Sequence, residues 1–423
     1  MSAQKDGREV RCVVARRLVT CDPVRSTPAN PLGAIEGGAF AFTVKDGNEG
    51  GMILAAGEES ELRARFPDAA WERHPDAVVT PGLVDAHTHA AWVGSRDNEY
   101  ALRMAGADYE AIAKAGGGIV ASMRSIRSAS EEEIAIALKA RLLRMAKMGV
   151  TAVEVKSGYG LDEENEHKQL GAIDRMWGDA EAPRVVPTFL GLHALPAEAN
   201  GDRDGYAAHV AERVLPAVID RGRAMFVDAY VDRSAFSVTQ ARPLFEKARK
   251  SGLGVRIHAG QFADVGGCEL AADVGALSAD HLEHVGENGI ARMAEAGVRA
   301  VLLPIASFTL RQDPPPIAAL RAAGVPLVVA SDANPGTAPT ESLPLAMALA
   351  VRMYGLTVAE TILGATREAA ASLGLSEHAG VLCEDRWADF VVWDLPHENA
   401  LVQPWGVPRA RHVVRAGHRI AGA

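Results

Sequence analysis

The stretch Pro81-Gly-Leu-Val-Asp-Ala-His-Thr-His89 joins an apolar run to two histidines that are separated by one residue. A short apolar run of this kind is typical of a buried strand. Alternate residues of a strand point to the same side, so His87 and His89 can share one metal ion. Taken alone the pair is weak evidence, because surface histidines and hydrogen-bonded core histidines are common. Its meaning depends on the fold around it.

Seven further apolar runs follow and alternate with helical stretches. In residues Glu131–Met148, for example, apolar side chains recur every three or four positions, the period of an amphipathic helix. Alternating strands and helices are typical of a parallel sheet, and eight such strands within about 250 residues predict a (β/α)8 barrel of the TIM type. The predicted strands are Leu83–His89, Val150–Lys156, Val185–His193, Met225–Val231, Gly254–Gln261, Ala276–His281, Ala300–Pro304 and Pro326–Asp332.

The two ends of the chain differ from this middle region. Short β-like pieces separated by Gly, Pro, Asn and Asp come first, and short strands return after a final predicted helix near Val358–Leu373. These pieces are Val10–Ala15, Ala39–Val44, Met52–Ala56, Ala77–Thr80, Asp389–Trp393 and His412–Arg415. We therefore expect a catalytic barrel at residues 81–375 and a small β-sandwich domain built from residues 1–80 and 376–423.

Composition and charge exclude several classes of protein. The 423 residues are 48% hydrophobic and 23% charged, as in ordinary globular proteins, and the net charge of −10 argues against a nucleic-acid partner. We find no apolar run near the roughly 18 residues of a membrane span, and Met1–Glu9 lacks the apolar core of a signal peptide. Four scattered cysteines without CxxC spacing favour a reducing compartment. We expect a soluble cytoplasmic protein.

Four side chains of metal-binding type come from predicted strand ends at one rim of the barrel. His258 ends the fifth strand and Asp332 ends the eighth, so both join His87 and His89 where barrel active sites lie. Three imidazoles and one carboxylate suit a single Zn²⁺ or Fe²⁺ with a position left for water, and such an ion favours hydrolysis. Asp332 is then placed to contact the metal and to accept a proton from the water.

His281 ends the sixth predicted strand at the same rim. It is a candidate to orient the attacking water or to stabilise the developing oxyanion. The alternative is that His281 only supports the metal ligands from behind.

Further motifs identify a family. Pro81–His89 resembles the first-strand motif of the amidohydrolase superfamily, which many activities share. More specific stretches, spread between about Pro81 and Leu375, resemble the imidazolonepropionase family. They are Gly94-Ser-Arg-Asp-Asn-Glu-Tyr100, Ala115-Gly-Gly-Gly-Ile-Val120, Lys156-Ser-Gly-Tyr-Gly-Leu-Asp162, Phe189-Leu-Gly-Leu-His-Ala-Leu-Pro196, Ser278-Ala-Asp-His-Leu-Glu283 and Ser331-Asp-Ala-Asn-Pro-Gly336.

The resemblance implies hydrolysis of the cyclic amide of 4-imidazolone-5-propanoate to N-formimino-L-glutamate in histidine degradation. It also implies one zinc or iron ion per chain and a homodimer. Carried over by motif, the metal ligands are His87, His89, His258 and Asp332, and the substrate-facing residues are Arg96, Tyr159, His193, Gln261, Asn334, Gly336 and Thr337. Arg96 offers a planar fork for the propanoate carboxylate.

Simpler alternatives stay open for several of these residues. Arg96 has acidic neighbours to pair with, in Asp97 and Glu99. Tyr159 can be a core aromatic, His193 a buried structural histidine, and Gly336 a turn residue.

The sequence departs from the family pattern at three places. In His258-Ala-Gly-Gln261 the family has an acidic residue where this chain has Gly260, and Asp264 or Glu269 are candidates to compensate. Asp232 stands where the family more often has glutamate, and Leu303–Phe308 differs from the usual Pro-Gly-Ala-Phe. The first departure keeps open an amidohydrolase or deaminase acting on another small nitrogen heterocycle. A non-catalytic metal- or ligand-binding protein is the alternative from a different class.

Overall fold

The computed structural model describes residues 4–5, 8–44, 50–107, 117–403 and 405–422. Most of the stretch Met1–Glu9 and the first two residues of the Ala115–Val120 motif therefore lie outside the described residues. Within the described part of the chain, every helix is too short or too polar to cross a membrane.

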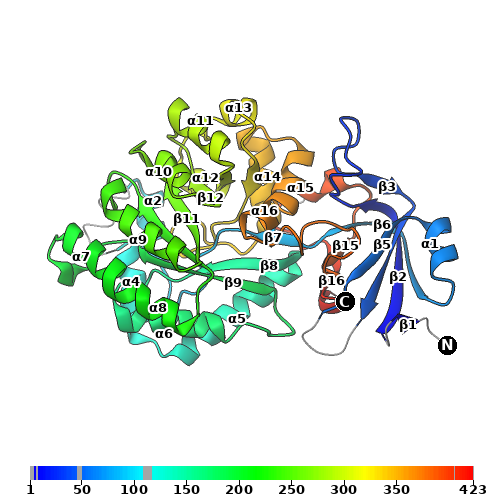
Figure 1. The fold of residues 1–423 in the computed structure, drawn as a ribbon, viewed down its shortest axis with the longest axis horizontal. Coiled ribbons are helices and arrows are strands. Elements are labelled where there is room, and N and C mark those ends of the chain that lie inside the picture. Colours follow the sequence, from blue (N-terminus) through cyan, green and yellow to red (C-terminus); the bar gives the residue numbers. More distant parts are fainter. Residues whose placement is uncertain (1–3, 6–7, 45–49, 108–116, 404, 423) are drawn as a thin grey trace.

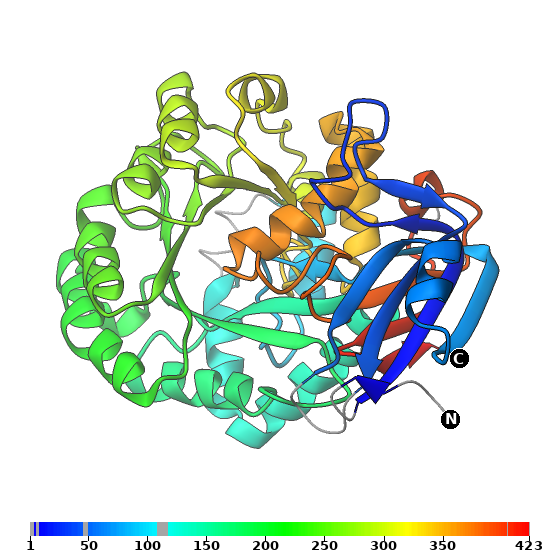
Figure 2. The same ribbon diagram turned by 45° about the vertical axis from the view of Figure 1, so that its right-hand side comes forward.

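Eight parallel strands form a nearly closed barrel, which Figures 1 and 2 show surrounded by helices. Each strand pairs with the next one along the chain, so the order β7 to β14 is the order of the sequence. The strands are β7 (Leu83–Asp85), β8 (Val150–Lys156), β9 (Arg184–Leu192), β10 (Phe226–Val231), β11 (Gly254–Ala259), β12 (Ser278–His281), β13 (Arg299–Leu302) and β14 (Leu327–Val329). The predicted barrel is confirmed, and each predicted run overlaps one of these strands.

The first and last strands meet just beyond their regular ends. Thr88 and Ala333 form an isolated parallel bridge. The amide of Asp332 donates to the carbonyl of His87 at 3.1 Å, and the amide of His89 donates to that of Ala333 at 3.0 Å. Backbone hydrogen bonds therefore join the two segments that carry His87, His89 and Asp332.

Helices cover the outside of the barrel because each presents one apolar face to the strands. Helix α5 (Glu131–Lys147), close to the predicted Glu131–Met148, begins at a capping box of Ser130 and Glu133 and buries Ile134 and Leu138. The other helices after β7 are α2 (Asp97–Met104), α4 (Ile119–Ser128), α6 (Glu163–Asp174), α7 (Arg203–His209), the π-helix η2 (Val210–Val214), α8 (Leu215–Arg221), α9 (Val238–Lys250), α10 (Gly267–Asp273), α11 (Glu287–Ala296), α12 (Pro304–Leu310), α13 (Ile317–Ala322) and α14 (Leu343–Tyr354), with 3₁₀ turns η1 (Ala197–Ala199) and η3 (Glu398–Val402).

The predicted final helix over Val358–Leu373 is two helices, α15 (Val358–Gly364) and α16 (Arg367–Ser372). The chain leaves the helical path at Thr366, whose φ is −131° and ψ −93°. The carbonyl of Ala365 accepts a hydrogen bond from the amide of Val84 in β7 at 2.8 Å. A contact with a distant strand therefore interrupts a helix that the local pattern predicts as continuous.

Both ends of the chain build one mixed sheet of nine strands beside the barrel, as predicted for a small β domain (Figure 1). Its strands are β1 (Gln4–Lys5), β2 (Arg8–Val19), β3 (Ala34–Glu36), β4 (Gly38–Val44), β5 (Ile53–Glu58), β6 (Ala70–Pro81), β15 (Phe390–Trp393), β16 (Ala410–Arg415) and β17 (His418–Gly422), with helix α1 (Glu59–Arg65) between β5 and β6. Only Gly82 separates β6 from β7. The limits at residues 80 and 375 stay a prediction.

Candidate metal centre and substrate cavity

Four predicted ligands meet at one point of the rim. The Nε2 atoms of His89 and His258 lie 3.4 Å apart, and Oδ1 of Asp332 lies 3.6 Å from Nε2 of both His87 and His89. A tetrahedral ion with metal–ligand bonds of about 2.1 Å places its ligand atoms about 3.4 Å apart. The spacing of these donor atoms therefore fits one small divalent cation.

The protonation of His87 supports the same conclusion. Its Nδ1 lies 2.6 Å from Oδ2 of Asp280. A carboxylate only accepts hydrogen bonds, so Nδ1 of His87 is the donor. Its Nε2 is buried and has no hydrogen-bond partner among the described residues. A buried lone pair that faces two other imidazoles and a carboxylate is what a metal ligand requires.

Behind the ligands lies a network of buried charges that sequence reasoning missed. Nζ of Lys156 donates to Glu154 at 2.6 Å and to Asp228 at 2.7 Å, and Asp228 in turn lies 3.0 Å from Nδ1 of His258. All three charged side chains are fully buried. Burial lowers the pKa of Lys156, but the charges of Asp228 and Glu154 outweigh it and raise the pKa above its usual value. The ammonium therefore stays charged and holds the carboxylate behind His258 in place.

A second cation completes this network. Arg256 on β11 is fully buried, donates to the carbonyl of Ala86 at 2.8 Å and lies 3.4 Å from Asp280, the partner of His87. The signal in the sequence is the placing of charged residues inside otherwise apolar strands, at Glu154, Asp228, Arg256 and Asp280. Buried charges in such positions require partners.

Asp332 is held in an unusual conformation. Its φ is +56°, in the left-handed region that residues other than glycine rarely adopt. Ser331 anchors the preceding residue, since its amide and hydroxyl donate to Asp85 at 3.0 and 2.6 Å. Burial raises the pKa of Asp332 to about 7, against the opposing charge of His281. Strain of this kind is typical of functional sites.

A cavity of about 480 Å³, counting its open mouth, lies over the ligand atoms, within the size range of small-molecule sites. It brings together ten of the twelve predicted site residues. Its predicted lining residues are His89, Arg96, Tyr159, His193, His258, Gln261, His281, Asp332, Asn334 and Thr337. Ile119, Tyr230 and Phe262 line it as well and were not predicted. His87 lies fully buried below, and Gly336 lies behind Arg96.

Arg96 is one of the residues that line the cavity. Its Nε donates to Glu99 at 2.8 Å, so the pairing raised as an alternative exists. Its Nη2, however, has no hydrogen-bond partner among the described residues. A side chain on Gly336 would collide with the guanidinium, because an added Cβ would lie 2.4 Å from Nη1 of Arg96. Gly336 is therefore more than a turn residue, because the absence of a side chain at this position leaves space for the guanidinium of Arg96.

Tyr159 and His193 lie on neighbouring loops. His193 donates from Nδ1 to the carbonyl of Gly158 at 2.8 Å, which leaves its Nε2 as an acceptor. Burial, aided by the charge of His258, lowers the pKa of His193 to about 3, so the ring is neutral. The loop itself is fixed by Glu166, whose carboxylate accepts the amides of Gly158, Gly160 and Leu161 at 2.8–3.0 Å.

Gln261 is oriented by an unpredicted residue. The hydroxyl of Tyr230 donates to Oε1 of Gln261 at 2.6 Å, which leaves the amide NH₂ for a ligand. Tyr230 is the residue before the last in β10, so its place near a strand end was the available signal.

Asn334 builds the loop after β14. Its Oδ1 accepts the amides of Gly336 and Thr337 at 2.8 and 2.7 Å, and its Nδ2 donates to the carbonyl of Asp332 at 2.7 Å. The side chain that was predicted to face the substrate is thus engaged within the protein, although it borders the cavity.

His281 has a carboxylate behind it. Its Nδ1 lies 3.8 Å from Glu283, which accepts the hydroxyl of Ser307. Burial lowers the pKa of His281, but the nearby carboxylates of Glu283 and Asp332 outweigh it and raise the pKa. Ser307 belongs to the stretch Leu303–Phe308 that departs from the family; this stretch is not among the residues that line the cavity, and its Ser307 contacts Glu283 behind His281.

The two other departures also lie behind the cavity wall. Gly260 has φ +67°, and a Cβ added there would lie 3.4 Å from the amide nitrogen of Val285, outside the described lining. Asp264 and Glu269 bind Gly286 and Asn288, so neither replaces a missing acid at the site. Asp232 accepts the amide of Phe262 at 2.9 Å and so fixes a residue of the cavity wall.

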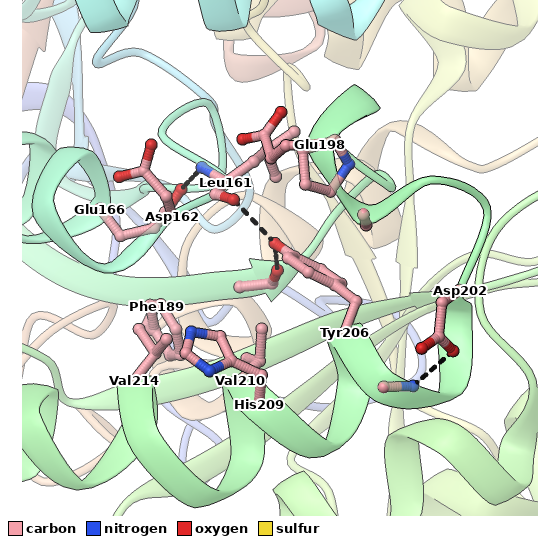
Figure 3. Close-up of a pocket in the computed structure, with 14 residues that line it drawn as sticks. Leu161, Asp162, Glu166, Phe189, Glu198, Asp202, Tyr206, His209, Val210 and Val214 are labelled. Carbon is pink, nitrogen blue, oxygen red and sulfur yellow. Dashed lines mark hydrogen bonds between the residues drawn. The ribbon is translucent and has the colours of Figure 1, made fainter.

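A larger cavity of about 870 Å³ lies elsewhere, between α6, β9 and α7 (Figure 3). Phe189, Val210 and Val214 give it an apolar floor, and the hydroxyl of Tyr206 donates to the carbonyls of Leu161 and Gly191. None of the predicted site residues is among the described residues that line it. Size therefore does not identify the functional cavity here, whereas the metal-type ligands do.

Comparisons with known proteins agree with this geometry. A model described as the amidohydrolase family matches residues 78–419. The imidazolonepropionase of Polaromonas sp. is 48% identical over 368 residues, which cover 87% of this chain and 86% of that protein. Those of Cupriavidus taiwanensis and Bradyrhizobium diazoefficiens are each 44% identical, over 93% and 91% of this chain and 93% and 94% of theirs.

Solved structures share the fold at low sequence identity. A triazine hydrolase variant superposes with a TM-score of 0.75 at 16% identity, over 98% of this chain and 95% of that chain. An adenosine deaminase from Xanthomonas campestris with bound zinc superposes with a TM-score of 0.70 at 21% identity, over 96% and 92%. Proteins with several different activities share this fold, so the fold alone does not identify a narrower family. The sequence identity of 44–48% to imidazolonepropionases does identify one. The chain therefore belongs to the amidohydrolase family and, within it, to the imidazolonepropionases.

Proposed function

We propose that the chain hydrolyses the cyclic amide bond of 4-imidazolone-5-propanoate and releases N-formimino-L-glutamate, a step of histidine degradation. The observation that carries this proposal is one cavity that lies over the His₃Asp centre and is also lined by Arg96, whose Nη2 has no hydrogen-bond partner among the described residues. A small ring that carries both an amide carbonyl and a carboxylate matches a metal centre and a guanidinium in one cavity. The relatives named imidazolonepropionase, which are 44–48% identical to this chain, support the same substrate.

The metal centre consists of His87, His89, His258 and Asp332. A divalent ion held there supplies Lewis-acid activation of water and of the amide carbonyl. The donor set suits Zn²⁺ or Fe²⁺, and we propose zinc because three neutral imidazoles and one carboxylate at these spacings match its tetrahedral preference.

The chain's own residues hold and orient the substrate. Arg96 binds the propanoate carboxylate, and the amide NH₂ of Gln261 donates to an oxygen or ring nitrogen acceptor. Tyr159, His193 and the Asn334–Thr337 loop form the walls that fix the ring. Holding the ring in one orientation accounts for a large part of such rate enhancements.

Proton transfer falls to two groups at the rim. Asp332 accepts the proton of the attacking water, and His281, backed by Glu283, stabilises the developing negative charge. The departing ring nitrogen receives a proton from one of these two groups, and the amide bond then breaks.

The test is turnover of freshly generated 4-imidazolone-5-propanoate by the purified protein, with metal content measured on the same sample. We expect hydrolysis to N-formimino-L-glutamate with one catalytic ion per chain. Because Gly260 lies outside the described cavity lining, we expect its departure from the family pattern to be tolerated. A metal-loaded protein that leaves this substrate intact would refute the proposal and favour another nitrogen heterocycle.

The family resemblance further leads us to propose a homodimer in the cytoplasm. Light scattering of the purified protein tests the first point, and a mass equal to one chain of 44.6 kDa would contradict it.

A further inference from the structure

A second group of metal-type ligands lies in the nine-stranded sheet. It consists of Glu72 and His74 on β6 and His412 on β16. Oε1 of Glu72 lies 3.1 Å from Nε2 of His74 and 3.8 Å from Nε2 of His412. These values bracket the separation of about 3.4 Å between ligand atoms of a tetrahedral ion with bonds of about 2.1 Å.

The three residues come from opposite ends of the chain. β15 lies between β6 and β16 in the sheet, but it pairs with β6 only from Val78 to Pro81. His74 lies before this paired part, and its ring nevertheless approaches that of His412, with centroids 5.6 Å apart. An ion bound here would connect the N-terminal and C-terminal halves of the sheet, apart from the barrel rim (Figure 1).

The environment of these three side chains favours metal binding over a simple ion pair between Glu72 and a histidine. The side chain of His74 is only 6% exposed, and apart from Oε1 of Glu72 at 3.1 Å its Nε2 has no hydrogen-bond partner among the described residues. Glu72, which is half exposed, leaves a side open for water as a fourth ligand.

The nearby arginines do not occupy the proposed metal position. Arg411 is paired with Asp76 and Asp394 at 3.0 and 3.2 Å. The guanidinium of Arg419 lies 3.9 Å from the same oxygen of Glu72, beyond hydrogen-bond distance, on a side chain that is 45% exposed.

We propose that Glu72, His74 and His412 bind a second divalent cation of the borderline class, Zn²⁺ above all, as a structural clip between the two chain ends. The site does not touch the substrate cavity, so its occupancy stabilises the sheet without changing the chemistry at the rim. This inference does not rest on the proposed function.

The test is equilibrium dialysis of the metal-stripped protein against Zn²⁺, with elemental analysis of the bound metal. We expect two ions per chain for the natural sequence, one for His412→Gln and one for His87→Ala, which removes the rim site. The combined His87→Ala, His412→Gln variant should bind none. His209→Gln, which replaces an exposed histidine of α7, serves as the matched control and should keep both ions.

Two further readouts separate this site from the rim. Zn²⁺ should raise the Tm of His87→Ala but not that of the combined variant, and His412→Gln should turn over substrate at the natural rate. If His412→Gln does not fold, Glu72→Gln replaces it, and the affinity for the second ion should fall at least about tenfold, since loss of groups even behind a ligand costs about 10- to 100-fold. One ion per chain in the natural sequence, or two in His412→Gln, would overturn the proposal.

Discussion

Replacing Gly336 by alanine tests whether Arg96 binds the substrate carboxylate. The φ of Gly336 lies outside the left-handed region, so alanine fits the backbone without strain. The added Cβ, however, would lie 2.4 Å from Nη1 and 2.7 Å from Cζ of Arg96. Only the end of a flexible side chain has to move, so we expect the protein to fold with nearly unchanged stability.

The expected magnitude follows from that displacement. Ordinary contact with a Cβ begins at 3.4 Å, so the guanidinium must retreat by 1 Å. A misplacement of about 1 Å in a binding group can cost on the order of 100-fold, and loss of a charge-assisted hydrogen bond costs about 1.5–3 kcal/mol. We therefore expect KM for 4-imidazolone-5-propanoate to rise about 10- to 100-fold, with a smaller change in kcat.

Steady-state kinetics of Gly336→Ala, Arg96→Ala and the double variant measure this effect, with thermal unfolding as the control. Arg96→Ala alone should raise KM by one to two orders of magnitude. The double variant should equal Arg96→Ala, because the collision vanishes once the guanidinium is gone. An unchanged KM in Gly336→Ala, or a full additional loss in the double variant, would refute the reasoning.

Three other substitutions and removal of the metal test the centre, its buried support and the packing of the barrel. His87→Ala should abolish metal binding at the rim and turnover while circular dichroism shows a folded barrel, and an unfolded variant would contradict this. Lys156→Met leaves the carboxylate of Asp228 without its cation and should lower the free energy of unfolding by about 3–5 kcal/mol in denaturant titrations, whereas a stable variant would mean that the network is dispensable. Gly149→Ala places a Cβ 2.4 Å from Trp393 at φ +94°, far from the rim, and should cost about 1–3 kcal/mol of stability without changing KM. Removal of the metal by a chelator should stop turnover and lower Tm, and Zn²⁺ should restore both; activity that survives complete removal would exclude a metal-dependent reaction.

Some parts of the site could not be predicted because they depend on contacts between distant strands. The pairing of His87 with Asp280 joins residues 193 positions apart, and Lys156 reaches Asp228 across 72 positions. Each partner lies in a strand that local patterns identify only as apolar. Charged residues inside such strands indicate that partners exist, but they do not say which ones.

Local patterns also do not show how the three-dimensional environment directs a residue. The final helix breaks at Thr366 because the carbonyl of Ala365 binds β7. Gly260 departs from the family pattern beside a ligand, yet its Cβ direction leads away from the cavity. Asn334, predicted from its motif to face the substrate, directs its polar atoms into its own loop.

The sequence by itself determined the barrel, a small β domain built from both chain ends and the set of side chains that gather at the rim. Period and strand ends are local properties, and parallel strands bring their carboxyl ends to one edge. Only the tertiary structure decided how the ligands are held, by buried charges that attract one another across the barrel. It alone also brought His74 and His412 together, because no local pattern relates residues at opposite ends of a chain.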